Sequence, residues 1–294
     1  MTAVLINPHA ADLGPANAVL NARATRHYEQ RFAGPLSIKT VIAGRATWET
    51  DRGRFELVPG SVLLINDGEE YTITVDALQP VETYCFFFAR GFVEDAYRAA
   101  TTGSAALLRR ADVSSAPRPV EFCEPLQFDA SLIAIINRAH DGHSLEDAFY
   151  AAAFELVRAY ADIAARTSRL PSLRASTREE LARRLRIATA YLHANADRGV
   201  TIAEAAREAC LSPFHFHRLF TRFHGVTPHR YLGRLRLERA RALLCASEVS
   251  VAEVAYECGF ESAGSFATLF KRTFGVTPAK SKNREDTPPV RALP

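Results

Sequence analysis

The chain has 294 residues, 48% hydrophobic and 23% charged, which is ordinary for a globular protein and long enough for about two domains. Its net charge of +3 is unevenly divided: residues 1–173 carry 16 basic and 21 acidic side chains (−5), and residues 174–294 carry 20 and 12 (+8). This asymmetry is expected when only one domain binds a polyanion. No run approaches 18 apolar residues and no leader pattern opens the chain, so we expect a cytoplasmic protein that is neither secreted nor inserted in a membrane.

Cysteine usage indicates a reducing compartment. The five cysteines are odd in number, scattered, and never spaced as Cys-x-x-Cys. We therefore interpret them as reduced structural thiols, and neither disulfides nor zinc ligands are expected.

Residues 35–90 are predicted to form β-strands. Short apolar runs are separated by turn signals at Gly44, 51–53, 59–60 and 66–68. Strands at this spacing suggest a small barrel or sandwich. The predicted strands are 36–42, 55–58, 62–65, 71–75 and 82–88.

Aromatic side chains in this β-rich region have two interpretations. They are candidate walls of an effector pocket, because ligand cavities are mostly apolar, or they simply fill a small barrel. Arg31 or Arg45 is a candidate anchor for an anionic effector. The candidate wall residues are Trp48, Tyr71, Tyr84 and Phe86.

A long amphipathic helix is predicted over residues 145–166. Its apolar stripe consists of Leu145, Phe149, Ala152, Leu156, Tyr160 and Ile163, at spacings of three and four. This stripe either packs on the chain's own barrel or pairs with a second copy. Residues 168–176 follow as the best linker candidate.

Residues 202–278 contain two copies of one helical module, offset by about fifty residues. Each copy ends in Gly-Val-Thr-Pro. A repeated unit presents two equivalent surfaces, and DNA is a suitable partner because it repeats every helical turn. The matching pairs are Phe216/Phe266, Leu219/Leu269, Phe220/Phe270, Arg222/Arg272, Gly225/Gly275, Val226/Val276, Thr227/Thr277 and Pro228/Pro278.

Helix-start signals repeat as well. Capping boxes are predicted at Thr177, Thr201 and Ser250, each followed three residues later by glutamate. The last two lie 49 residues apart, one fewer than the later matches, so the second copy should carry one extra residue in its inter-helix turn. Ser212-Pro213 is an N-cap followed by proline at the first helical position.

The second helix of the first copy has two faces. Its phenylalanine and leucine stripe should be buried, and the opposite face offers arginine, histidine and hydroxyl groups that suit the major groove. An ordinary solvated helix is the alternative. The predicted base contacts on this helix are Phe214, His217, Arg218 and Thr221, with Arg222 and Arg230 predicted at phosphates.

The second copy has fewer groups that can bond to bases. Thr268 is its one good candidate for a base contact, and Lys271 and Arg272 are predicted to hold phosphates. Residues 228–244 should form one helix of about 25 Å that braces the two copies. Its arginines at 230, 234, 236, 239 and 241 either contact phosphates or pair with Glu238.

These features resemble the AraC/XylS family of bacterial transcription regulators. The resemblance rests on the paired module with its Gly-Val-Thr-Pro ends and on the pattern Tyr-Leu-x-x-x-Arg-Leu-x-x-Ala over residues 231–240, and it covers about residues 180–282. It implies two recognition helices in adjacent major grooves, with bases read from Phe214, His217 and Arg218. The second helix departs from the family, which usually has arginine or glutamine where Gly264 and Thr268 stand.

The resemblance implies an α+β protein with an N-terminal cupin-like β-barrel, flanking helices, and an all-α domain of two helix-turn-helix subdomains joined by a long helix. The implied function is sequence-specific regulation of transcription at double-stranded promoter DNA. A small-molecule effector, a homodimer partner and, for an activator, RNA polymerase are the implied partners. The expected domains are 1–168 (effector binding and dimerisation), 169–176 (linker), 177–282 (DNA binding) and 283–294 (disordered tail).

The alternatives are a cupin-type enzyme with an accessory DNA-binding module and a helical module that binds another protein. Residues 28–139 contain no histidine, so the clustered imidazoles of a metal-dependent cupin oxygenase are missing. Neither a glycine-rich phosphate loop nor a nucleophile elbow occurs. We therefore expect no catalytic residue, no metal and no cofactor.

Overall fold

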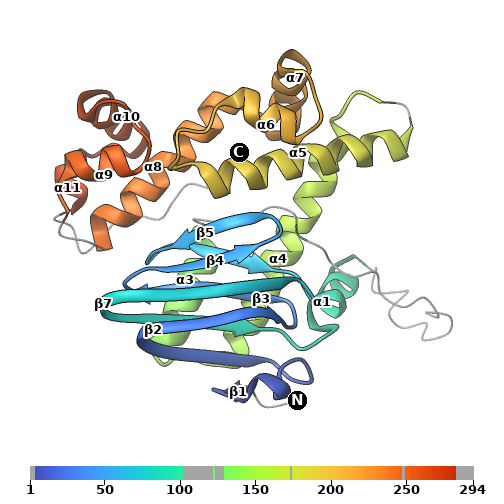
Figure 1. Ribbon diagram of the computed structural model, residues 1–294. Coiled ribbons are helices and arrows are strands. Elements are labelled where there is room, and N and C mark those ends of the chain that lie inside the picture. The colour runs from blue at the N-terminus through green and yellow to red at the C-terminus, as the bar shows by residue number, and fades with distance from the viewer. Residues whose placement is uncertain (1–3, 102–121, 123–128, 173, 247–248, 283–294) are drawn as a thin grey trace.

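The computed structural model describes residues 4–101, 122, 129–172, 174–246 and 249–282. The expected tail 283–294 and Cys123 lie outside these residues. A β-sheet with helices behind it forms the N-terminal domain, and a layer of helices lies above it (Figure 1). None of the helices in the described part of the chain is long and apolar enough to cross a membrane.

A curled sheet of seven strands forms the half-barrel of the N-terminal domain, in the order β1-β2-β7-β3-β6, with β4 pairing β5 and β7. The long strand β7 organises the sheet. Its C-terminal half pairs with β3, and its N-terminal half pairs with β4, so the sheet curls around it. The strands are β1 (Leu5–Ile6), β2 (Ala18–Ala33), β3 (Ser37–Ala43), β4 (Ala46–Thr50), β5 (Gly53–Leu57), β6 (Val62–Ile65) and β7 (Glu70–Phe87).

Two sequence predictions need correction here. The runs 71–75 and 82–88 belong to one strand, β7. Strand β2 pairs with both halves, and its register shifts between Ala24/Val81 and Arg26/Asp76. Pro80 lies in that irregular stretch, where its missing N–H breaks no ladder hydrogen bond. The prediction also omitted β2 and β4.

The described residues of the N-terminal domain also form the helices α1 (Phe92–Thr101), α3 (Ala130–His140) and α4 (Leu145–Ser168). The predicted apolar stripe of α4 packs on the domain's own sheet. Phe149 is fully buried there, with its ring 4.5 Å from that of Phe86. Two aromatic side chains of α4 outside this stripe, Tyr150 and Phe154, are exposed.

The helical domain consists of α5 (Ala175–Asn195), two helix-turn-helix units and the helices α8 and α11. The first unit is α6 (Ile202–Glu208) with α7 (Pro213–His224), and the second is α9 (Val251–Glu257) with α10 (Ala263–Phe274). Helix α8 (Pro228–Ala246) joins them, and α11 (Pro278–Lys282) follows.

The local signals of the repeat are confirmed with one exception. The capping boxes at Thr201 and Ser250 are both formed. The turn between the two helices holds residues 209–212 in the first unit and 258–262 in the second, which is the predicted extra residue. The exception is Thr177, which lies inside α5, because that helix begins earlier, after Arg174.

The two domains are packed against each other. Helix α5 lies on β5, and a Cβ atom at Gly53 would lie only 2.6 Å from Ala194 Cβ. Val58, directly after β5, is buried in the core of the second helix-turn-helix unit. On the other side, Arg166 of α4 lies 3.4 Å (Nη1 to Nδ1) from His224 at the end of α7.

Candidate nucleic-acid interface and ligand cavity

Helix α7 separates a buried stripe from an exposed one, as predicted. Phe216, Leu219, Phe220 and Phe223 are at most 1% exposed. Ser212 caps the start of the helix by accepting a hydrogen bond from the backbone N–H of His215, and Gly225 ends it in the left-handed conformation. Burial of this stripe fixes which side chains face outward.

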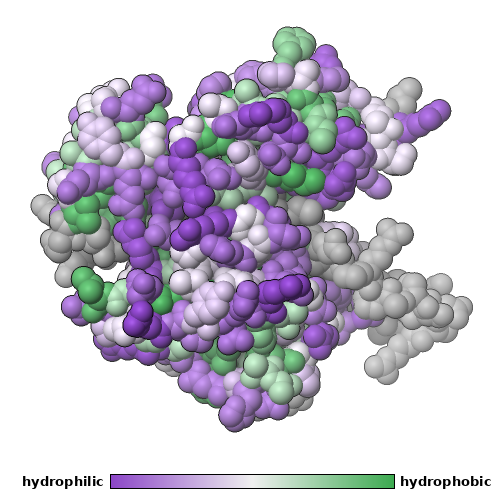
Figure 2. All heavy atoms as spheres, viewed as in Figure 1, coloured by the Kyte–Doolittle hydropathy of each residue, from purple (hydrophilic) through white to green (hydrophobic). Residues whose placement is uncertain are grey.

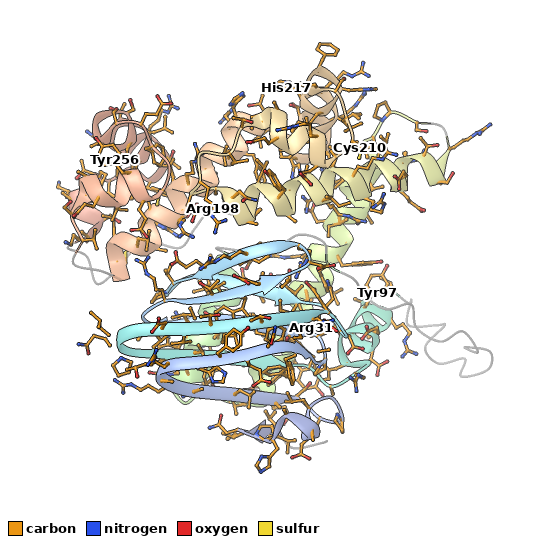
Figure 3. All side chains as sticks on the ribbon, viewed as in Figure 1. Arg31, Tyr97, Arg198, Cys210, His217 and Tyr256 are labelled. Atoms are coloured by element: carbon orange, nitrogen blue, oxygen red, sulfur yellow. The ribbon has the colours of Figure 1, made fainter. Side chains whose placement is uncertain are left out.

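The opposite face of α7 carries the predicted DNA contacts. Phe214 is 79% exposed, and His217, Arg218 and Arg222 are also exposed. His217 lies at the end of the molecule farthest from the sheet (Figure 3). The Thr221 hydroxyl donates to the carbonyl of His217 at 2.7 Å, so it retains acceptor capacity toward a base.

Helix α10 presents a smaller set of polar groups. Lys271 and Arg272 are exposed near its C-terminal end, and Thr268 is exposed near its middle. The Thr268 hydroxyl donates to the carbonyl of Gly264 at 3.0 Å, which leaves it as an acceptor only. Both α7 and α10 lie on the side of the helical domain that faces away from the sheet (Figure 1).

The arginines of α8 serve different purposes. Arg230, predicted at a phosphate, is exposed. Arg234 and Arg241 both pair with Glu238 on their own helix, at 3.6 and 3.3 Å. Arg236 donates to the carbonyl of Ala196 at 2.7 Å. Arg239 points to the N-terminal domain, where it pairs with Glu56.

Two buried histidines stabilise the first helix-turn-helix unit through hydrogen bonds. His193 Nε2 lies 2.9 Å from Tyr231 Oη, and His224 Nε2 lies 3.0 Å from Thr189 Oγ1. Burial lowers the pKa of His193 to about 3. Burial, assisted by the Arg166 guanidinium, also holds the pKa of His224 well below its usual range. Both rings are therefore neutral at pH 7 and serve the core rather than DNA.

The N-terminal domain contains a cavity of about 280 Å³ on the concave side of its sheet. Trp48 and Tyr71 line it. Tyr84 and Phe86, also predicted as pocket walls, lie on the other face of β7 and pack toward α3 and α4. The reason is strand alternation, which directs Cys85 and Phe87 into the cavity instead.

Neither Arg31 nor Arg45 is among the lining residues of this cavity. Arg31 is an exposed residue paired with Glu70 at 2.9 Å, and Arg45 pairs with Glu257 of the helical domain at 2.9 Å. The buried cation of the cavity is Lys39 on β3, which is 1% exposed. In the sequence Lys39 lies inside an apolar run, and this position is its one sequence signal of burial.

Within the described ranges, no group of three or more histidine, cysteine, aspartate or glutamate side chains is arranged to hold a metal ion. None of the described cysteines, which are Cys85, Cys210, Cys245 and Cys258, forms a disulfide.

Comparison with known proteins agrees with this two-domain organisation. The AraC-like ligand binding domain matches residues 16–154, and a helix-turn-helix domain matches residues 205–284. The chain belongs to the AraC/XylS family. The half-barrel with the cavity is thus the family's ligand-binding domain, and α6–α11 lie within its helix-turn-helix domain.

Among curated relatives of this AraC-type chain, the HTH-type transcriptional activator RhaS of Escherichia coli is 41% identical over 108 residues. The match covers 37% of this chain and 39% of the relative, so the chain spans about two fifths of that relative's length. Two solved structures are also similar. An AraC-type regulator from Chromobacterium violaceum is 27% identical (37% of this chain, 95% of that chain, TM-score 0.33), and ToxT from Vibrio cholerae is 12% identical (91% and 97%, TM-score 0.35).

Proposed function

We propose that this protein is a transcription regulator that binds promoter DNA through α7 and α10 and responds to a small effector in its N-terminal domain. One observation carries the proposal: two helix-turn-helix units present their second helices on the same side of the helical domain, away from the sheet (Figure 1). A duplex lying across that side meets both helices without displacing the N-terminal domain.

In this proposal α7 reads sequence. Arg218 suits guanine, whose O6 and N7 accept two hydrogen bonds from a guanidinium, and the exposed Phe214 ring suits a thymine methyl group. His217 and Thr221 contact neighbouring bases. On α10, Thr268 is the proposed base contact. The proposed phosphate contacts are Arg222, Arg230, Lys271 and Arg272, all of them exposed.

Helix α8 sets the distance between the two recognition helices. Its 19 residues span about 28 Å at 1.5 Å per residue. Successive major-groove faces on one side of a duplex lie about 34 Å apart. A stiff helix of this length therefore supports the proposal that α7 and α10 enter adjacent major grooves.

The cavity and the helical domain share one β-hairpin, which offers a route for regulation. Trp48 of β4 lines the cavity, and its neighbour Thr47 is the pairing partner of Glu56 on β5. Glu56 in turn pairs with Arg239 of α8. We propose that an effector shifts the population of hairpin positions, and with it the orientation of the two units.

The proposed partners also include a second copy of the chain, as the family resemblance implies, and RNA polymerase if the protein is an activator. The predicted stripe of α4 is covered by its own sheet, so a dimer contact through α4 uses its other face. That face carries the exposed Tyr150 and Phe154.

A salt titration tests the DNA proposal. Binding of the full-length protein to a duplex selected from a random pool is measured by fluorescence anisotropy between about 50 and 200 mM salt. Four phosphate contacts predict that log K falls linearly against log salt with a slope of about −3.6, from about −0.9 per contact. Affinity that stays flat as salt rises would rule out this mode of binding.

A further inference from the structure

The cavity of the ligand-binding domain buries a cation without a carboxylate partner among the described residues. Lys39 Nζ lies 2.9 Å from Tyr71 Oη, 3.7 Å from the centre of the Phe87 ring and 4.4 Å from the centre of the Tyr71 ring. Aromatic faces attract an ammonium group, yet they replace only part of the hydration that burial removes. An anion entering the cavity would supply the rest.

The donors at this position are free to bind such an anion. The Lys39 ammonium donates one N–H to the Tyr71 hydroxyl, which leaves two N–H groups and the Tyr71 O–H for an acceptor. Burial raises the pKa of Tyr71, so its hydroxyl keeps its proton at neutral pH. Two donors 2.9 Å apart fit the two oxygens of one carboxylate.

The rest of the cavity selects the body of the ligand. Leu20, Ile73, Val75 and Trp48 give it a largely apolar lining. Its charged lining residue besides Lys39 is Glu29, which lies on the exposed part of β2 together with His27. A second anionic group near Glu29 would be repelled, so the lining favours a single negative charge.

We propose that the effector is an apolar monocarboxylic acid whose carboxylate is bound by Lys39 and Tyr71 at the buried end of the cavity. This inference rests on the proposed function, since it names the effector class for the same domain. A cavity of about 280 Å³ fits a small aromatic acid or a medium-chain aliphatic acid.

Binding of such an acid should depend on pH. Burial lowers the pKa of Lys39 to about 7. A bound carboxylate favours the ammonium form, so affinity is highest below pH 7 and falls by up to about tenfold per pH unit above it. The other titratable groups around the cavity are Tyr71, Cys85, His27 and Glu29. Burial raises the pKa of Cys85, and His27 and Glu29 are exposed.

The experiment uses Trp48, the only tryptophan in the chain, as a fluorescent reporter inside the cavity. The full-length protein is titrated with benzoate, phenylacetate and octanoate, and with the three matching neutral amides, at about pH 6.5. We expect at least one acid to bind about tenfold or more tightly than its amide, and this preference to decline at pH 8.5.

Lys39→Met should lose about tenfold or more in affinity for that acid, and with it the pH dependence, while its affinity for the amide changes by less than about threefold. Arg31→Met, which removes an exposed cation from the same domain, should behave as the wild type. Circular dichroism establishes that both variants are folded.

Three outcomes overturn the proposal: none of the acids binds, acid and amide bind equally, or Lys39→Met retains the wild-type affinity for the acid. DNA binding of the same preparations without any acid is measured separately. Failure of acid binding with intact DNA binding refutes only the effector class, and loss of DNA binding refutes the proposed function.

Discussion

Lys39 destabilises the folded chain, and the cost depends on pH. Burial lowers its pKa from 10.5 to about 7. Between these pH values the unfolded chain holds a proton that the folded chain has lost, so the free energy of unfolding rises with pH across this window. The destabilisation by Lys39 has its full size below pH 7. Lys39→Met should therefore stabilise the protein by a few kcal/mol near pH 6 and by roughly half as much near pH 9. Urea unfolding followed by Trp48 fluorescence measures both values.

Arg31→Met is the matched control for this stability measurement, because Arg31 is exposed and its pair with Glu70 is solvated. It should leave the unfolding free energy essentially unchanged at either pH. If Lys39→Met raised the unfolding free energy equally at pH 6 and pH 9, burial of the Lys39 ammonium would not be the cause of the destabilisation.

Arg218 is predicted to distinguish bases. Arg218→Ala should cost about 1–3 kcal/mol on a selected duplex and much less on random DNA, because a bidentate contact to guanine is lost only on the specific site. Arg222→Ala, one turn further along the same exposed face, should weaken both complexes equally, as a phosphate contact does. Anisotropy titrations on the two duplexes measure this, and equal losses for Arg218→Ala would show that it contacts only the backbone.

Side chains whose environment is set by local periodicity could be predicted from sequence, and others could not. The stripe of Phe216, Leu219 and Phe220 follows from helical spacing and is buried as expected. Lys39 is different. A lone lysine in an apolar strand is usually exposed, and it is buried here because β7 curls over β3 and brings Tyr71 and Phe87 to it. Lys39 is more than thirty residues away from both aromatic residues in the sequence, so no local pattern predicts these contacts.

At the scale of elements, the same distinction separates the helices and strands that the sequence predicts from those that it does not. Helix α8 and both helix-turn-helix units have strong periodicity, caps and terminal glycines, and each was predicted. Strand β2 was missed because its residues from Asn21 onward are mostly exposed, so the alternation that marks a half-buried strand is weak. It is a strand because β7 offers it a long pairing edge.

Helix α10 should contribute affinity more than sequence discrimination. Gly264 has no side chain, and the hydroxyl of Thr268 is bonded to its own helix. The double variant Lys271→Ala/Arg272→Ala should weaken binding to selected and random DNA alike and make the salt slope shallower by about 2. Thr268→Ala serves as the control on the same face, with no change in slope. A slope that stays unchanged in the double variant would show that these cations do not contact phosphates.

At the scale of the whole molecule, charged side chains link the two domains. Arg45 lies between Glu56 and Glu257 at 3.3 and 2.9 Å, and Arg239 pairs with Glu56 and with Asp197. Figure 2 shows a strongly hydrophilic band across the boundary between the domains. These partners are separated by up to 212 residues in sequence, so their pairing could not be predicted. The second helix-turn-helix unit and α8 are thereby fixed to a hairpin that also borders the cavity.

Removing the central carboxylate should loosen this boundary. In Glu56→Gln both Arg45 and Arg239 lose a charged partner. The loss of stabilisation is larger at Arg239, which is 8% exposed, because few waters can replace the carboxylate there. We expect amides of β5 and of α8 to exchange with deuterium faster by about tenfold, equivalent to about 1.4 kcal/mol of local stability. Mass spectrometry of peptides covering residues 53–58 and 236–244 of the full-length protein measures this.

Glu49→Gln is the matched control, since it removes a carboxylate from the same hairpin whose partner, Arg54, also belongs to that hairpin. It should leave exchange in 236–244 unchanged. If the hairpin carries the effector's influence to α8, Glu56→Gln should also reduce the change in DNA affinity that a bound acid produces, whereas Glu49→Gln should preserve it. Such a coupling is worth about 1–3 kcal/mol, well within the range of paired titrations. Equal exchange in the two variants would mean that packing contacts such as those of Val58 and Gly53 hold the domains together without these ion pairs, and that the charges at the boundary set only its polarity.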